Sequence, residues 1–474
     1  EINFYTEQEY NTWKKDNNDG KGWSVKYFKG LGTSTAREFK DYFKDKKSIE
    51  FEYSGEECNN AIDLAFNKKR ADDRKDWLCQ YERDKIVDIK SGSISFKRFT
   101  DEEMIHFSKY DCERSIPNLM DGQKIASRKV LFSAFKRNLV KEVKVAQFSG
   151  YISEHSCYHH GEASLVGTII GMAAEYVGNN NISLLVPKGQ FGTRLRGGQD
   201  HASERYIFTH LNEITKFIYP ESDNNVLEYK YDDGTKVEPW FYAPIIPMVC
   251  VNGGKGIGTG FSSEIPCFKV KDIINYILYK VGDGETKNDT IPPVRLHYQD
   301  FKGSIQEISK TKYMLKGNYE ILSTDEIHVT ELPVGLWTET FKEHLESLMD
   351  CKDTKTKKKV QGQIKSYKDM STDTLVDFKI KFSTGVLSNL LTQKADDYQN
   401  KLEKVLKLTT TKSLTNMWLF DHKEKLKKYK SVYEIIEAYI PVRLEIYQKR
   451  IDYLIALLEK EVMILTNKAR FIKE

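Results

Sequence analysis

The chain has 474 residues, of which 30% are charged and 12% aromatic, and its formal net charge is +4 at pH 7. This length is too great for one hydrophobic core and predicts several domains, while the composition excludes a chain that is disordered throughout. The longest strongly apolar run, at 244–251, is too short to cross a bilayer, and seven scattered cysteines without a CxxC pair argue against a zinc module.

Residues 1–80 mix short apolar stretches with two basic clusters, YFKGLGTSTAREF at 27–39 and FNKKRADDRKDWL at 66–78. No signal peptide opens the chain, and the first ten residues, EINFYTEQEY, are typical of the interior of a domain. We therefore expect a piece of a longer protein.

Helical periodicity extends from about residue 115 to residue 180. The segment 126–139 predicts an amphipathic helix with apolar residues on one side and basic residues toward the other: Val130, Leu131, Ala134 and Phe135 against Lys129, Lys136 and Arg137. The segment 162–178 is mostly small and apolar and ends at a glycine, which predicts a buried helix. From Gln123 to Lys144 seven basic residues accompany one acid, and this excess favours a polyanionic partner over an ordinary solvated face.

Short strands and turns are expected over 181–270. Short helices followed by a glycine-punctuated, basic, strand-rich stretch predict a winged variant of helix-turn-helix. Helical and β segments alternate from about 270 to 418, with a lysine-rich stretch at 350–360 that predicts an exposed loop. A long helix is expected from about 431, where apolar residues recur at heptad spacing and predict a helical arm: Leu444, Tyr447, Ile451, Leu454 and Leu458.

Tyr206 directly follows Arg205, behind a glycine-rich loop that carries Arg194 and Arg196. A phenol with a pKa of about 10 is only ~0.1% ionised at pH 7. To attack a phosphodiester it needs a proton acceptor and fixed positive charge at the transition state. Arg205 and the loop arginines could supply the charge, and His159 or His160 could face the same cleft.

Each of these signals has a structural alternative. A tyrosine is usually a packing residue, a histidine pair at a helix start is usually a cap or core residue, and a glycine-rich loop is commonly only a turn. The glycines of this loop would also allow close approach to a DNA backbone: Gly189, Gly192, Gly197 and Gly198.

Several long motifs decide between these alternatives, because they occur together and in order. They are YFKGLGTS (27–34), AFNKKRADDRKDWL (65–78), RSIPNLMDGQKIASRKVL (114–131), KVAQFSGYISE (144–154), YHHGEASL (158–165), GQFGTR (189–194), RYIFT (205–209) and VNGGKGIGTGFS (251–262). The whole arrangement resembles the DNA-cleavage core of the type IIA DNA topoisomerases in their single-polypeptide eukaryotic form.

The resemblance implies a multidomain α+β fold. We expect the C-terminal part of a TOPRIM domain at 1–80, a winged-helix cleavage domain at 81–268, a mixed α/β tower domain at 269–419 and the start of a coiled-coil arm at 420–474. The implied function is ATP-dependent strand passage through a transient double-strand break, with double-stranded DNA as partner, a homodimer as the active form, no membrane and a nuclear location.

The resemblance also assigns roles to individual residues. Tyr206 is the implied nucleophile that becomes joined to a 5′ phosphate, Arg205 stabilises the transition state, and His160 either helps the phenol lose its proton or holds a phosphate oxygen. Arg114, Lys124 and Arg128 grip the scissile region. Further DNA contacts are expected from Tyr158, His159, Arg194 and Lys255, and from Lys68, Lys69 and Arg74, for which a solvated surface is the alternative.

Ile257 stands between two glycines in VNGGKGIGTG. The resemblance implies a wedge that enters between base pairs and bends the DNA, whereas the structural alternative is a hairpin turn with its apolar residue in the core. The chain has Gly254 and Lys255 where the family usually has alanine and an acid, so the local detail is a departure.

The family cuts with Mg²⁺ held by a TOPRIM glutamate and an Asp-x-Asp-x-Asp cluster, and no such cluster is present in this sequence. Asp72–Asp73 and Asp232–Asp233 are the nearest candidates, and we expect both to be solvated. The Mg²⁺ ligands and the ATP-binding domain are therefore expected outside this chain. The chain alone is predicted to bind DNA and to cleave it poorly.

Two other readings stay open at the level of sequence. The chain could be a winged-helix module that bends DNA without cutting it, with Tyr206 as a hydrogen-bond donor to the backbone. It could also be a relative of the meiotic break-forming proteins. Those proteins would not need residues 270–474, and the long C-terminal helix disfavours this reading.

Overall fold

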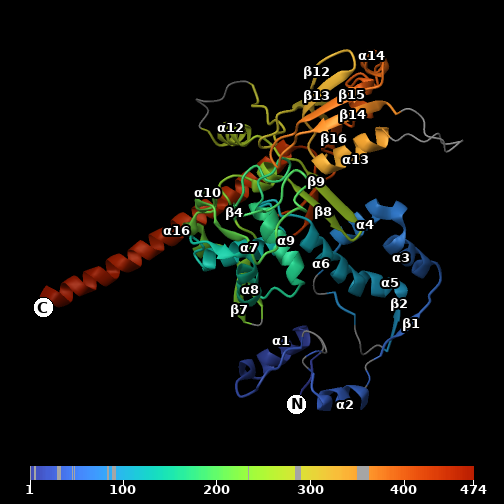
Figure 1. The fold of residues 1–474 in the computed structure, drawn as a ribbon. Coiled ribbons are helices and arrows are strands. Elements are labelled where there is room, and N and C mark those ends of the chain that lie inside the picture. The colour runs from blue at the N-terminus through green and yellow to red at the C-terminus, as the bar shows by residue number, and fades with distance from the viewer. Residues whose placement is uncertain are drawn as a thin grey trace.

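The structure is a computed structural model. It describes residues 2–473 except 5, 6, 29–31, 33, 45, 47, 83, 84, 88–91, 233, 283–289 and 350–361. The chain forms a mixed helix and sheet fold in several packed bodies (Figure 1), as the sequence predicts. The lysine-rich stretch at 350–360 lies outside the described residues.

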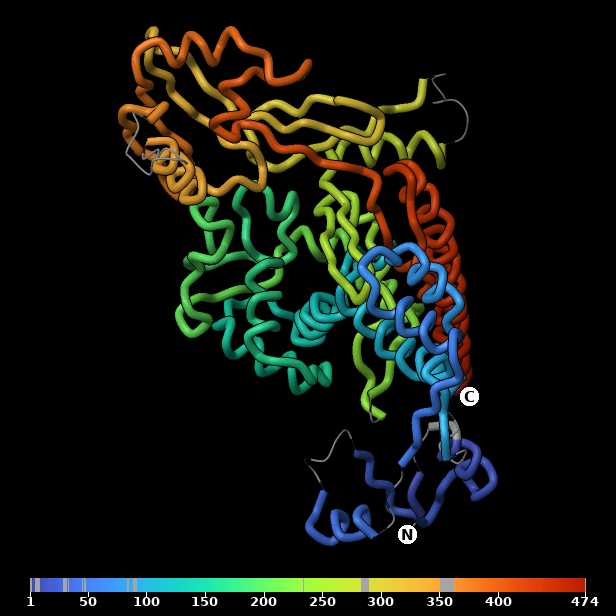
Figure 2. Tube along the Cα trace, turned by 90° about the vertical axis from the view of Figure 1, so that its right-hand side faces the viewer, coloured from blue at the N-terminus to red at the C-terminus, as the bar shows by residue number. Residues whose placement is uncertain are grey.

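The N-terminal region is mainly helical. Its elements are α1 (Glu7–Asp16), α2 (Ala36–Lys44), β1 (Glu50–Glu52), α3 (Glu56–Phe66), α4 (Ala71–Cys79), β2 (Ser93–Ser95), α5 (Phe96–Phe99) and α6 (Ile105–Ser115). The short strands β1 and β2 pair in parallel. A π-helical turn, Thr100–Met104, joins α5 to α6, and Trp77 of α4 donates its indole N–H to Asp101 of that turn at 3.0 Å. Both ribbon views show α1 and α2 at the edge of the molecule, away from the central body (Figures 1 and 2).

The central region carries three small antiparallel sheets. Its elements are α7 (Ile125–Lys136), β3 (Val143–Lys144), α8 (Val145–His155), α9 (Glu162–Ala173), β4 (Leu185–Lys188), β5 (Phe208–Leu211), α10 (Glu213–Ile218), β6 (Tyr229–Asp232), β7 (Thr235–Pro239), α11 (Met248–Asn252), β8 (Gly254–Gly258) and β9 (Phe261–Ile265). Strand β5 lies between β3 and β4, β6 pairs with β7, and β8 pairs with β9.

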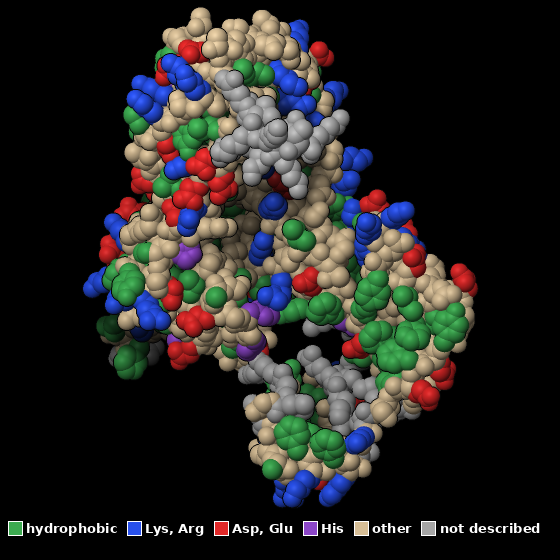
Figure 3. All heavy atoms as spheres, turned by 45° about the vertical axis from the view of Figure 1, so that its right-hand side comes forward, with side chains coloured by type: hydrophobic (Ala, Val, Ile, Leu, Met, Phe, Trp, Pro, Cys, Tyr) green, Lys and Arg blue, Asp and Glu red, His purple; other side chains and the backbone are tan. Residues whose placement is uncertain are grey.

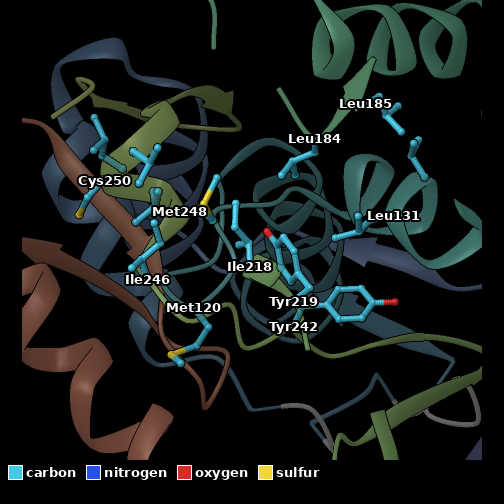
Figure 4. Packing of buried hydrophobic residues seen from close by; sticks show 14 of the residues in the cluster. Met120, Leu131, Leu184, Leu185, Ile218, Tyr219, Tyr242, Ile246, Met248 and Cys250 are labelled. Carbon is cyan, nitrogen blue, oxygen red and sulfur yellow. The ribbon is translucent and has the colours of Figure 1, made fainter. Parts of the chain in front are cut away.

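The largest hydrophobic core fills this central region. Leu131 of α7, Leu185 of β4 and Met248 of α11 are all buried in it, and Tyr219 and Tyr242 pack edge to face with ring centroids 5.8 Å apart. Figure 4 shows these side chains converging from separate elements. Because α7, α8 and α9 share this core with β5, the strand that follows Tyr206 has a rigid support.

One expectation about α7 is wrong. The sequence places Lys129 toward the polar side of the helix, but its side chain is buried, with Nζ 2.7 Å from Oε2 of Glu238 on β7. The ammonium also donates to the carbonyl of Ser156. A buried charge of this kind is tolerated because an opposite charge and a carbonyl satisfy it.

The third region contains two further sheets. Its elements are α12 (Val270–Val281), β10 (Ser304–Ser309), β11 (Lys312–Lys316), β12 (Asn318–Ile321), β13 (Glu326–Glu331), α13 (Thr338–Met349), β14 (Ile364–Asp369), β15 (Phe378–Phe382), α14 (Val386–Thr392), α15 (Lys401–Val405) and β16 (Thr409–Ser413). The strand orders are β10-β11-β16 and β12-β13-β15-β14. Phe341 of α13 packs edge to face on Phe378 of β15, which joins the helix to one face of the larger sheet.

A two-stranded hairpin, β17 (Met417–Phe420) and β18 (Leu426–Tyr429), leads into α16 (Val432–Lys473). The beginning of α16 is buried in the central core through Ile435, Ile436 and Tyr439, and Arg443 pairs with Asp223 at 2.6 Å. The rest of the helix projects away from the molecule (Figure 1), so the predicted long helix is confirmed. Within the part of the chain that the structure describes, no helix is both long enough and apolar enough to cross a membrane.

Candidate active site

Tyr206 lies at the end of a tight turn that leads into β5. Backbone hydrogen bonds fix this turn against the start of α8: the amide of Ala146 donates to Glu204 O at 3.1 Å, and that of Val145 donates to Ile207 O at 3.0 Å. Ile207 is buried directly behind the turn. Tyr206 itself is 76% exposed, and Arg205 is exposed beside it. The turn therefore presents a phenol and a guanidinium to solvent from a fixed backbone.

Neither side chain is engaged within the protein. Tyr206 and Arg205 form no side-chain hydrogen bond or ion pair with any residue that the structure describes. Exposed large side chains with unused polar ends on a rigid support are typical of ligand-contacting residues. A tyrosine that served only packing would be buried, as Tyr219 and Tyr242 are.

His160 lies just before α9 in a small aromatic and basic cluster. Its Nε2 is 2.9 Å from the hydroxyl of Tyr110 on α6, and the ring of Tyr158 packs edge to face on it at 5.4 Å. Partial burial lowers the pKa of His160, and the positive charges of Arg114, His159 and Lys129 lower it further. At neutral pH the imidazole is therefore held uncharged.

His159 points elsewhere. Its Nε2 is 3.0 Å from Oδ2 of Asp232 on β6. Arg114, at the end of α6, is exposed, whereas Lys124 is partly buried and its burial lowers the pKa of the ammonium group. The structure thus brings Arg114, Tyr158 and His160 together. Among the described residues, no hydrogen bond or ion pair joins this cluster to Tyr206 or Arg205.

Three arginines expected at the DNA surface are instead buried. Arg128 donates to both oxygens of Asp121, at 2.7 and 3.1 Å, and Arg194 forms an ion pair with Glu331 of β13. Arg74 donates to the carbonyls of Leu64 and Asn67 at 2.9 and 2.7 Å. These guanidinium groups hold the fold together, and in this structure they offer no N–H to a phosphate in solvent. Lys68 and Lys69, by contrast, are exposed on the 3-10 turn Lys68–Arg70.

The glycine-rich loop before Tyr206 packs against the protein itself. Gly197 has a φ of 61°, and a Cβ at this position would collide with the indole of Trp337. Gly192 and Gly198 similarly approach each other's backbone. The expected reason for these glycines, access to a DNA backbone, is therefore replaced by close packing between the loop and the segment before α13.

The β8–β9 hairpin carries Lys255 and Ile257. Ile257 is 74% exposed, so the alternative in which it is tucked into the core is wrong. A Cβ at Gly256 would collide with the carbonyl of Ser115 at the end of α6, which explains the glycine before Ile257. On the other side, Ser263 of β9 donates to Trp418 O at 2.6 Å. The hairpin is thus braced from both sides and holds an apolar tip in solvent.

The exposed basic side chains lie on a hollowed face. Figure 3 shows Lys and Arg side chains within the hollow and His side chains at its lower end. This distribution suits a polyanionic partner. Tyr110 is the residue that sequence reasoning missed here. Its position one helical turn before Arg114 places both on the same side of α6, and this spacing was the available signal.

The described residues do not fit a Mg²⁺ site. They contain no group of three or more His, Cys, Asp or Glu side chains arranged to hold a metal. Asp72 and Asp73 are bonded to Lys75 and Arg70, each at 2.6 Å, and Asp232 is bonded to His159. No step of the chemistry at Tyr206 is therefore derived through a metal.

Comparison with known proteins gives a consistent answer over the whole chain. Residues 114–474 match the sequence model of the family described as DNA gyrase/topoisomerase IV, and residues 1–112 match that of the C-terminal associated domain of TOPRIM. Human DNA topoisomerase 2-alpha is 43% identical and human DNA topoisomerase 2-beta 42% identical, each across 100% of this chain. The chain spans about a third of the length of these relatives, 31% and 29% respectively.

A solved structure agrees with this match. The topoisomerase II DNA-binding, cleavage and re-ligation domain of Plasmodium falciparum has a TM-score of 0.86 and 45% sequence identity, over 99% of this chain and 62% of that chain. The match includes residues 270–474, which the meiotic reading does not need. The chain belongs to the type IIA DNA topoisomerase family.

Proposed function

We propose that this chain is the DNA-cleavage and religation core of a type II DNA topoisomerase, with Tyr206 as its nucleophile. The observation that carries the proposal is the exposed Arg205–Tyr206 pair, presented from a turn that α8 and β5 hold fixed. The printed names of the relatives, DNA topoisomerase 2 and a DNA-binding, cleavage and re-ligation domain, support it.

The chemistry exchanges one phosphodiester for another. The Tyr206 oxygen attacks the scissile phosphorus and forms a P–O bond, while the bond from phosphorus to the 3′ oxygen breaks. The phenol loses its proton and the 3′ oxygen gains one, which leaves a 5′-phosphotyrosine and a free 3′ hydroxyl. Reversal of the same step reseals the strand. Arg205 stabilises the negative charge that builds on the phosphoryl oxygens, a role usually worth about 3–4 kcal/mol.

DNA is held by charge and bent by the hairpin. Ile257 enters between base pairs, and partial unstacking lets the duplex follow the protein surface. Exposed basic residues contact phosphates, namely Arg114, Lys255, Lys68 and Lys69, with Lys124 nearer the scissile bond. Such contacts carry little base information, so sequence preference is slight and affinity falls steeply with salt.

The finer assignments are part of the same proposal. We infer a TOPRIM portion at 1–80, a winged-helix domain at 81–268, a tower at 269–419 and the arm at 420–474, although the two matching family models meet near residue 113. The family likeness supports a homodimer that uses ATP and Mg²⁺ and works in the nucleus. The described residues do not supply the Mg²⁺ ligands.

The direct test is covalent attachment to DNA. The full-length protein is incubated with supercoiled DNA, Mg²⁺ and ATP, denatured, and assayed for protein-linked DNA. Wild type and Tyr231→Phe should both give linked DNA, and Tyr206→Phe should give none. Tyr231 is a matched control because it is 70% exposed on β6 and has no assigned role. Equal linkage in Tyr206→Phe would assign the nucleophile to another residue.

A second function, DNA bending without cleavage, is favoured by one observation, the exposed Ile257 on its braced hairpin. Under this reading Tyr206 only contacts the backbone. No linkage in any variant, together with DNA bending that Ile257→Ala abolishes in a fluorescence-transfer assay, would support it over the cleavage core.

A further inference from the structure

We propose that Tyr110 is a positioning residue for His160: its hydroxyl donates to Nε2, so the imidazole carries its proton on Nδ1 and serves as a hydrogen-bond donor to a DNA phosphate, not as the base for Tyr206. This inference rests on the proposed function of the Tyr206 turn. It decides between the two roles that the family likeness leaves open for His160.

The geometry is specific to one ring nitrogen. The Tyr110 oxygen lies 2.9 Å from Nε2 of His160, and the ring centroids are 6.2 Å apart at a tilt of 42°, so the phenol meets the imidazole through its hydroxyl. Tyr158 packs edge to face on the other side of the imidazole. The ring is therefore fixed by one hydrogen bond and one aromatic contact from separate elements.

The surrounding charges decide which group donates. The groups that face His160 are Tyr110 and Arg114 from α6, Lys129 from α7, and His159 and Tyr158 from its own loop. Burial and the neighbouring positive charges lower the pKa of His160, and burial raises the pKa of Tyr110. Near neutral pH the pair is thus a neutral phenol and a neutral imidazole, in which the O–H donates and the unprotonated nitrogen accepts.

This arrangement has a chemical consequence. An Nε2 that already accepts from Tyr110 cannot also take the proton of Tyr206, whereas Nδ1–H remains a donor. A neutral imidazole in this tautomer can bond a phosphate oxygen, and a fixed hydrogen bond at the second nitrogen keeps both the tautomer and the ring orientation.

The tautomer can be measured without any cleavage. Nitrogen-15 NMR of histidine-labelled protein at pH 8, with the His160 signals assigned by their loss in His160→Gln, reports which nitrogen is protonated. We expect Nδ1–H in wild type and in the control Tyr453→Phe, and a substantial shift toward Nε2–H in Tyr110→Phe. A protonated Nε2 in wild type, or no change in Tyr110→Phe, overturns the proposal.

Single-turnover cleavage supplies the second readout. Loss of one neutral hydrogen bond should lower the cleavage rate of Tyr110→Phe by about threefold to tenfold, with DNA affinity unchanged. A faster rate in Tyr110→Phe would mean that Nε2 is the base and that Tyr110 obstructs it, which overturns the proposal. Failure of the proposed function has a different sign, because Tyr206→Phe would still become linked to DNA whatever the tautomer of His160.

Discussion

Arg194 and Arg205 belong to the same loop and have opposite surroundings. Arg194 is 6% exposed and pairs with Glu331, itself 1% exposed, on the larger sheet of the third region. Arg205 is exposed, and no ion pair involves it among the described residues. One end of the loop is thus anchored inside the protein, and the other end meets solvent.

The difference separates architecture from chemistry. A buried guanidinium paired with a carboxylate contributes order to the fold, since its charge is already neutralised. An exposed guanidinium keeps its charge for a phosphate. The two arginines therefore predict two kinds of loss on mutation, one in stability and one in rate.

The largest effect is expected at the buried end. Arg194→Met should destabilise the protein by about 3–5 kcal/mol, because it leaves the Glu331 carboxylate buried without its partner. The double variant with Glu331→Leu should recover most of this loss. Urea unfolding followed by tryptophan fluorescence checks it, since Trp337 packs against the same loop. Equal destabilisation in the single and double variants would contradict the pairing argument, and weaker DNA binding by folded Arg194→Met would indicate a DNA contact after all.

The next effect is expected at the exposed end. Arg205→Ala should lower single-turnover cleavage by about 10²–10³-fold, the usual cost of losing one donor to a transition-state oxyanion. Its urea midpoint should stay at the wild-type value because the side chain has no described partner. Arg470→Ala, an exposed arginine near the far end of α16, provides the control. A cleavage rate within twofold of wild type would remove Arg205 from the active site.

The smallest effect is expected on the hairpin. Lys255→Ala should reduce the slope of log affinity against log salt by about 1 and weaken DNA binding modestly at low salt, as for one lost phosphate contact. Fluorescence anisotropy over a salt series measures both quantities, with Lys460→Ala as control. An unchanged slope would mean that Lys255 faces solvent in the complex, and that the hairpin acts through Ile257 alone.

Periodicity predicted the helices well and their partners poorly. The segments expected at 126–139 and 162–178 form α7 and α9, and the helix expected from 431 begins at Val432. Lys129 was misplaced because its carboxylate partner, Glu238, lies on a strand far along the chain, and a local pattern does not contain that pairing.

The candidate site divides in the same way. The exposed Tyr206, Arg205 and Ile257 agree with the roles expected of them, although those roles stay predictions. Arg128 carries the same charge in the sequence and lies inside the protein, because Asp121 folds back onto it from the turn before α7. Sequence indicates which residue types are present, and burial then decides which of them can reach a ligand.

The long helix α16 has a mechanical consequence. Its root is clamped by Tyr439, which donates to Pro244 O, and by Arg443 and Arg450 on the single carboxylate of Asp223. Residues 451–473 are all exposed and extend about 35 Å at 1.5 Å per residue. A tilt of about 5° at the root would therefore carry the far end through roughly 3 Å. The helix acts as a lever whose fulcrum lies in the same core that supports the Tyr206 turn.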